Sequence, residues 1–188
     1  ADYAQIRDFL LWNIEKADAA VLSIDTLLYG GLIPSRLHTL EEDEALERLM
    51  LLKTLREKNP SVKLYAFHCI MRCPTYSSDD EEPDYYADYG AEIHQLGRLT
   101  HLEKLGMGDA QDCAAMREKI DADALADYLN RRAFNRRMNI RTLDLVEDGT
   151  IDFLIIPQDD SAKYGYTAMD QQAVRAVIDE KVLNDRVI

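Results

Sequence analysis

Residues 19–36 read AAVLSIDTLLYGGLIPSR, and this stretch determines how the rest of the chain is interpreted. The first six residues are mostly apolar and Asp25 follows them, which is typical of a short strand buried inside a sheet. The segment from Tyr29 to Arg36 contains two glycines and a proline, and we interpret it as a shaped loop. The sequence therefore predicts a strand over about 19–24 that is followed by a shaped loop.

Two further strands are predicted downstream. Residues 62–71 (VKLYAFHCIM) are rich in β-branched and aromatic side chains, and Arg72 follows them. Residues 153–157 (FLIIP) form the third apolar segment, which leads into Asp159 and Asp160. Segments with helical spacing of apolar residues separate the three strands. Strands that alternate with helices favour an α/β fold, in which right-handed crossovers join parallel strands.

The segment between the second and third strands is long and helical. It extends over about residues 85–146, and we interpret it as a helical insertion. Three strong strands are few for a closed barrel or for a complete doubly wound sheet. We therefore expect residues 1–188 to form a single α/β domain, and this domain to be part of a larger one.

Composition argues against several classes of protein. The chain of 188 residues has a formal net charge of −13, with 47% hydrophobic and 30% charged residues. Such an acidic protein lacks the basic face that nucleic acids and anionic membrane surfaces require. No apolar run approaches the roughly 20 residues that span a bilayer, and we expect a cytoplasmic protein with three reduced cysteines. A targeting segment that has been removed is compatible with a chain that begins without methionine.

Four polar residues follow the predicted strands: Asp25, Arg72, Asp159 and Asp160. In parallel α/β folds, ligands bind outside the carboxyl ends of the strands, because the crossover loops gather there. We therefore expect these side chains to open into one cleft. An aspartate after a strand often only caps the next helix, but capping explains one acid and not two acids with an arginine.

The adjacent acids Asp159 and Asp160 are the predicted catalytic residues. At the end of a strand, one carboxylate can face the site while the other orients a substrate group or raises the pKa of its neighbour. This division of roles suits acid–base catalysis. The alternative is a solvated turn, because pairs of acids are common.

Four side chains are predicted to bind substrate: Asp25, Tyr29, Arg36 and Arg72. The pair Gly30-Gly31 allows the backbone to approach a ligand beside the Tyr29 phenol. For Arg36, an anion clamp and a surface charge are equally good interpretations. His68 is expected to be a core histidine within a strand, and the acidic residues 79–82 are expected to be solvated. The sequence identifies no phosphate loop, no metal-ligand cluster and no cofactor.

Several motifs resemble one known family. Residues 23–36 (SIDTLLYGGLIPSR) resemble the signature of a bacterial family known as domain of unknown function 4127, and residues 70–72, 81–85 and 149–161 look similar too. Members of that family are longer and begin with a strand that leads into a Pro-Leu-Asp-x-Arg-Pro-like motif. The resemblance therefore implies that this chain is an internal fragment that lacks the first strand.

The resemblance to this family implies no activity, but a second one does. Adjacent aspartates at a strand end are similar to the catalytic pair of O-GlcNAcase-type glycosidases, in which one Asp orients the acetamido group of the substrate and the other is the acid/base. By this analogy of position, we expect a hydrolase that acts on a carbohydrate-like polar substrate.

Two alternatives remain open at this point. The first is a divalent-metal-dependent enzyme that uses Asp25, Asp159 and Asp160 as oxygen ligands. The second is a non-catalytic module that binds a small molecule through the same residues. In each case the expected partner is a small polar molecule or a carbohydrate, and self-association through the truncated edge of the sheet is a further expectation.

Overall fold

The computed structural model describes residues 2–188. Within these residues the chain forms seven α-helices and a three-stranded parallel sheet, with 58% of residues in helices and 9% in strands, so the α/β fold class is confirmed. The described chain divides into two compact units. Unit 1 contains the described residues through Cys69, together with Arg137–Pro157 and Ala176–Ile188; unit 2 contains Ile70–Arg136 and Gln158–Arg175. No helix within residues 2–188 has the length and apolar character needed to cross a membrane.

The sheet lies in unit 1 and is parallel throughout, as the sequence predicts. It consists of β1 (Ala19–Ser23), β2 (Lys63–Phe67) and β3 (Phe153–Ile155), in the spatial order β1-β2-β3. On the central strand, Tyr65 is paired with Val21 on one side and with Phe153 on the other. The carboxyl ends of all three strands therefore point to the same edge of the sheet.

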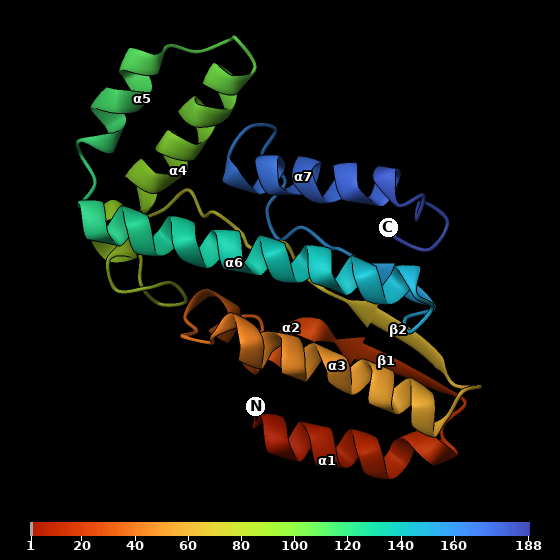
Figure 1. Cartoon of the computed structure of the whole chain (residues 1–188). Coiled ribbons are helices and arrows are strands. Elements are labelled where there is room, and N and C mark those ends of the chain that lie inside the picture. Colours follow the sequence, from red (N-terminus) through yellow and green to blue (C-terminus); the bar gives the residue numbers. More distant parts are fainter. Residues whose placement is uncertain (1) are drawn as a thin grey trace. The chain divides into compact units, whose positions relative to one another are not determined.

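The two faces of this sheet have different surroundings. Leu64 and Ala66 of β2 are buried, and in Figure 1 helix α3 (Glu42–Lys58) lies in front of part of β1. The alternate residues Tyr65 and Phe67 are 41% and 38% exposed. Parallel sheets are usually covered on both faces. In the part of the chain that the structure describes, the face carrying Tyr65 and Phe67 remains open.

β2 is shorter than predicted, because it ends at Phe67 and not at residue 71. His68 still donates its backbone N–H to Ile155, but the N–H of Cys69 turns to the Asp25 carboxylate. The last four residues of the predicted strand are therefore outside it, and the expectation that His68 lies within the strand was wrong. Ile70 forms only an isolated parallel bridge with Gln158.

Helix α2 (Ile24–Tyr29) lies where the sequence suggested the end of a strand and a loop. Its N-terminus is capped by Ser23, whose Oγ accepts a hydrogen bond from the N–H of Thr26 over 3.1 Å. Its C-terminus ends at Gly30, which has a left-handed φ of 91° that favours glycine. Asp25 therefore lies in the first turn of a helix that follows β1 directly.

Unit 2 is built from helices and loops. It contains α4 (Tyr86–Lys104), α5 (Ala110–Arg117) and the first parts of α6 (Ala122–Glu147) and α7 (Tyr166–Glu180). Its core includes the fully buried rings of Tyr86 and Tyr128 with Ile93 and Leu96. Unit 1 also contains α1 (Tyr3–Asn13), the second part of α6 and the short 3₁₀ helices η1 (Ile14–Lys16) and η2 (Pro34–Arg36).

Candidate functional site

In unit 1, the carboxyl group of Asp25 is buried at the carboxyl ends of β1 and β2. The side chain is 3% exposed, and its Oδ2 accepts a hydrogen bond from the N–H of Cys69 over 3.0 Å. No ion pair reaches Asp25 from any described residue. Burial raises the pKa of Asp25 from 3.8 to about 6, while the Cys69 N–H opposes this rise. A carboxyl group of this kind exchanges a proton close to neutral pH.

Tyr29 lies one helical turn from Asp25 and is also buried. Its hydroxyl group has no hydrogen-bond partner among residues 2–188, and its ring stacks on His38 with the centroids 4.6 Å apart. Burial, and after it the charge of Asp25, raises the pKa of Tyr29 well above 10, so the phenol stays protonated. A buried hydroxyl without a partner is a position for an ordered water or a ligand hydroxyl.

The hydrogen bonds of His68 fix which of its ring nitrogens carries the proton. Nδ1 lies 2.9 Å from Oγ1 of Thr142, and that hydroxyl donates its only hydrogen to the carbonyl of Met138. Nδ1 of His68 is therefore the donor and Nε2 is the unprotonated acceptor. Burial lowers the pKa of His68 to about 3, so the ring is neutral at physiological pH.

We call the group of Asp25, Tyr29, His38 and His68 the Asp25 cluster. Tyr29 links the two histidines, because the centroid of its ring lies 4.6 Å from that of His38 and 6.5 Å from that of His68. Arg36 belongs to the same unit and is 3% exposed, so the interpretation of Arg36 as a surface charge was wrong.

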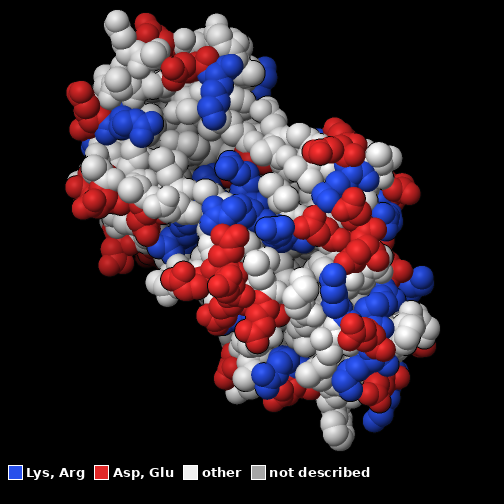
Figure 2. Space-filling view, in the orientation of Figure 1, with Lys and Arg blue, Asp and Glu red and all other residues white. Residues whose placement is uncertain are grey.

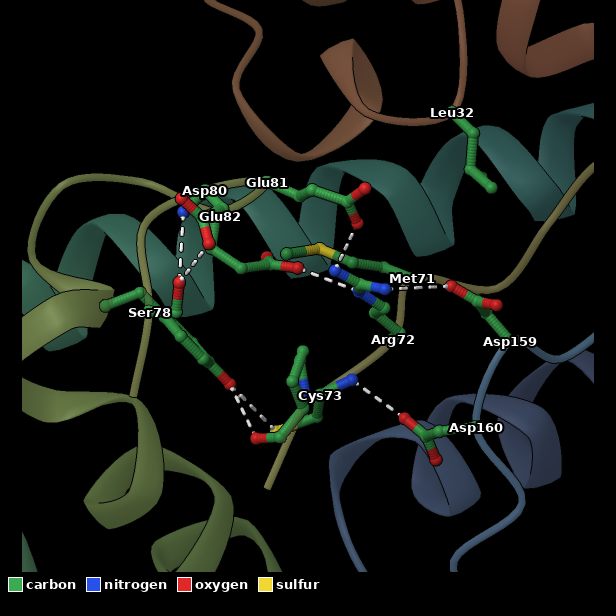
Figure 3. Close-up of polar contacts among 12 residues, drawn as sticks. Leu32, Met71, Arg72, Cys73, Ser78, Asp80, Glu81, Glu82, Asp159 and Asp160 are labelled. Carbon is green, nitrogen blue, oxygen red and sulfur yellow. Dashed lines mark hydrogen bonds and ion pairs between the residues drawn. The ribbon is translucent and has the colours of Figure 1, made fainter. Parts of the chain in front are cut away.

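In unit 2, Arg72 is surrounded by three carboxylates (Figure 3). Its Nε and Nη2 each lie 2.8 Å from an oxygen of Glu82 and Glu81 respectively, and its Nη1 lies 3.6 Å from Asp159. We call these four residues the Arg72 cluster. The Glu82 side chain is 1% exposed, so the expectation of a solvated acidic stretch was wrong at this position. An arginine held by three acids is fixed in orientation, and it neutralises only part of their charge.

Asp160 has partners different from those of its neighbour Asp159. Its Oδ2 accepts hydrogen bonds from the backbone N–H of Cys73 and from the hydroxyl of Thr167, both over 2.7 Å. Figure 3 shows Asp160 directed toward Cys73 and Asp159 directed toward Arg72. Oδ1 of Asp160 has no hydrogen-bond partner within residues 2–188. The two adjacent acids are thus held by separate contacts, and one oxygen remains for a ligand.

The comparison with known proteins agrees with the family resemblance of the sequence motifs. The family model described as "Protein of unknown function (DUF4127)" matches residues 1–188. The chain belongs to the DUF4127 family. No curated protein and no solved structure is significantly similar to it. The description of the DUF4127 family states no activity.

The predicted site residues of the DUF4127 chain fall into two groups of three. Asp25, Tyr29 and Arg36 lie in unit 1, whereas Arg72, Asp159 and Asp160 lie in unit 2. The single cleft that the sequence suggested for the strand-end residues stays a prediction.

Sequence reasoning missed several polar residues of the DUF4127 chain. Glu82 was one acid among four in a row, and no local pattern marks it as the buried one. The buried ion pair between Arg132 and Asp170 joins residues far apart in the sequence, over 2.6 Å.

No preformed metal site is found in the described part of the DUF4127 chain. Among residues 2–188, no group of three or more His, Cys, Asp or Glu side chains is arranged to hold a metal ion. The Asp25 cluster has a single carboxylate, and the carboxylates around Arg72 are already paired with its guanidinium. The metal-dependent alternative therefore has no ligand set within either unit.

Proposed function

We propose that this chain is a hydrolase for a carbohydrate-like polar substrate, in which Asp25 transfers the proton. The observation that carries this proposal is the Asp25 carboxyl group, buried at the carboxyl ends of two parallel strands with no cation beside it. This edge is where α/β folds bind their ligands. Burying a carboxyl group without a counter-charge lowers the stability of the fold, and such a group is therefore expected at a functional site.

The chemistry follows from the protonation of the Asp25 cluster. A general acid works best when its pKa is close to the operating pH, and the pKa of Asp25 is about 6. The Tyr29 hydroxyl is a donor without a partner, and Nε2 of His68 is an acceptor. A sugar-like molecule presents hydroxyl groups that both donate and accept, and it therefore complements this pair.

The adjacent acids Asp159 and Asp160 are the competing assignment for the acid–base pair, by analogy with O-GlcNAcase-type enzymes. Support for a ligand role comes from the free Oδ1 of Asp160 and from the 38% exposure of the Asp159 side chain. Against an acid role, Oδ2 of Asp160 is already occupied, because it accepts hydrogen bonds from the Cys73 N–H and from the Thr167 hydroxyl. We therefore propose substrate binding for these two acids and proton transfer for Asp25.

The experiment measures hydrolysis of a panel of 4-nitrophenyl glycosides between pH 4.5 and pH 8. We expect Asp25→Asn to lower kcat/KM by a factor of about 100 or more and to remove an apparent pKa near 6 from the pH profile. Asp43→Asn, an exposed carboxylate of unit 1, is the matched control and should leave turnover unchanged.

Three outcomes would contradict the proposal in different ways. Full turnover by Asp25→Asn, with loss in Asp159→Asn or Asp160→Asn, would transfer the acid–base role to the adjacent pair. Binding of sugars in calorimetry without turnover of any glycoside would identify a binding module. Turnover that depends on an added divalent cation would support the metal-dependent alternative.

A further inference from the structure

Unit 2 contains a small cavity that the proposed function does not use. Its volume is about 210 Å³, and α4, α6 and the beginning of α7 form its walls. Its polar lining consists of Thr100 and Lys104 from α4, Arg132 and Arg136 from α6, and Tyr166 and Asp170 from α7. Figure 2 shows Lys and Arg atoms gathered beside a hollow over the middle of α6.

The charge of this cavity is opposite to that of the whole chain. Three cationic side chains and one carboxylate line it, although the net charge of the protein is −13. Asp170 is the carboxylate, and it lies 2.6 Å from Arg132 and 2.9 Å from Arg136. One acid does not neutralise three cations, so the cavity keeps a positive potential that attracts an anion.

Arg132 supplies a fixed charge in the wall of the cavity. It is 3% exposed, and its two Nη atoms donate to the carbonyls of Met71 and Arg72 and to the hydroxyls of Tyr128 and Thr167. These bonds hold the guanidinium in one orientation. An arginine is never deprotonated in a protein, so this charge is permanent.

Lys104 and Arg136 have the donors that a ligand can reach. The Arg136 side chain is 40% exposed and uses only Nη1 to contact Asp170. Lys104 is exposed and has no ion pair among the described residues. The N-terminal end of the 15-residue helix α7 forms part of the same wall, and its partial positive charge adds to the two cations.

We propose that this cavity binds a small molecule through a phosphate or carboxylate group, held by Lys104 and Arg136 beside the fixed charge of Arg132. Charge-assisted hydrogen bonds from arginine and lysine are the usual means of binding both groups. A volume of about 210 Å³ holds a phosphate and a few further atoms, since one water molecule takes about 30 Å³. The inference does not depend on the activity of Asp25.

The test measures the Kd of inorganic phosphate and of citrate by calorimetry at constant ionic strength. We expect wild-type protein to bind one or both with a Kd below about 1 mM, and Lys104→Gln and Arg136→Gln each to weaken the affinity about tenfold, as loss of one charged hydrogen bond predicts. Binding of phosphate alone identifies a phosphate site, and binding of citrate alone identifies a carboxylate site.

The control is Arg137→Gln, the next residue of α6. The guanidinium of Arg137 contacts Glu42 in unit 1 and does not line the cavity. The affinity of the Arg137→Gln variant for both anions should therefore equal that of the wild type. Equal weakening in Arg137→Gln would overturn the proposal, because the binding would then follow overall charge. A Kd above about 1 mM for both anions would overturn it as well. Circular dichroism of each variant verifies that it is folded.

Discussion

The backbone N–H of Cys69 donates a hydrogen bond to the carboxylate of Asp25 over 3.0 Å, although 44 residues separate them in the sequence. This bond joins the residue just after the end of β2 to the first turn of α2, which follows β1. It holds one oxygen of the carboxyl group at the edge of the sheet. The proton carrier proposed here is therefore oriented by the backbone of a neighbouring strand end.

We expect Asp25→Asn to change the pH dependence of stability. The pKa of Asp25 is about 6 in the folded protein and 3.8 ordinarily, so folding favours the protonated form. The contribution of this group to the free energy of unfolding is then largest below pH 4 and is lost as the pH rises to 6. The shift of about two pKa units corresponds to about 3 kcal/mol at most, so Asp25→Asn should gain up to that amount over wild type at pH 7.5 and nothing at pH 4.

Urea denaturation of both proteins at pH 4, 5, 6 and 7.5 measures this difference. His68, whose pKa is lowered to about 3, opposes Asp25 because its contribution is lost as the pH falls from 6.5. It is present in both proteins and cancels in the difference. A stability difference that is the same at all four pH values would contradict the raised pKa of Asp25.

The two adjacent acids should differ in their importance for stability. Asp160→Ala removes the acceptor of the Cys73 N–H and of the Thr167 hydroxyl, and should cost about 1–3 kcal/mol. Asp159→Ala breaks a 3.6 Å ion pair whose acid is 38% exposed, and should cost at most about 1 kcal/mol. Chemical denaturation at pH 7 compares them, and equal costs would show that the two contacts are not distinct.

Arg132→Met should be strongly destabilising, by about 3 kcal/mol or more, because it leaves the carboxylate of Asp170 buried without its closest cation. The double variant Arg132→Met/Asp170→Leu removes both charges and should be more stable than the single variant. Thermal denaturation of the wild type, both single variants and the double variant gives the coupling energy. A double variant less stable than Arg132→Met would show that the ion pair is not the source of the loss.

Gly97→Ala should destabilise unit 2 although alanine favours helices. A Cβ atom at this position of α4 would lie 2.4 Å from Cδ2 of Tyr166, which is a steric clash. The rigid ring of Tyr166 cannot relieve this clash without a shift of the ring or of the helix. We expect a cost of about 1–3 kcal/mol, which exceeds the gain of about 1 kcal/mol in helix propensity. Tyr166→Leu as a second substitution should recover part of the loss. If Gly97→Ala is more stable than wild type in urea, the close packing of Tyr166 on α4 is wrong.

The sheet was predictable because its signal is local. Three short apolar runs, each followed by polar residues, indicated the strands, and the helical segments between them indicated a parallel arrangement. The boundary after Ser23 was missed, although Ile24, Leu27 and Leu28 have helical spacing between a serine and a glycine that cap the helix. An apolar run of six residues is compatible with a strand and with a buried helix. Only the capping residues at its two ends distinguish the helix from the strand.

The polar contacts were less predictable than the fold. Asp25 and Arg72 were identified because they follow strands, but the partners of Arg72 depend on which way each acid of the loop points. Glu82 turns inward and Glu81 is half exposed, and their sequence context is nearly the same. Arg132 and Asp170 lie on different helices, so their pairing needs the packing of unit 2.

The effect of polar substitutions on the open face of the sheet would show whether another part of the protein or a partner covers that face in the cell. Leu64 and Tyr65 are neighbours on β2, and one is fully buried while the other is 41% exposed. If nothing covers the open face in the cell, a polar residue at Tyr65 should be selected against no more than at any surface position, whereas Leu64 should accept almost none. If polar substitutions at Tyr65 were as damaging as those at Leu64, both faces of the strand would be covered in the cell.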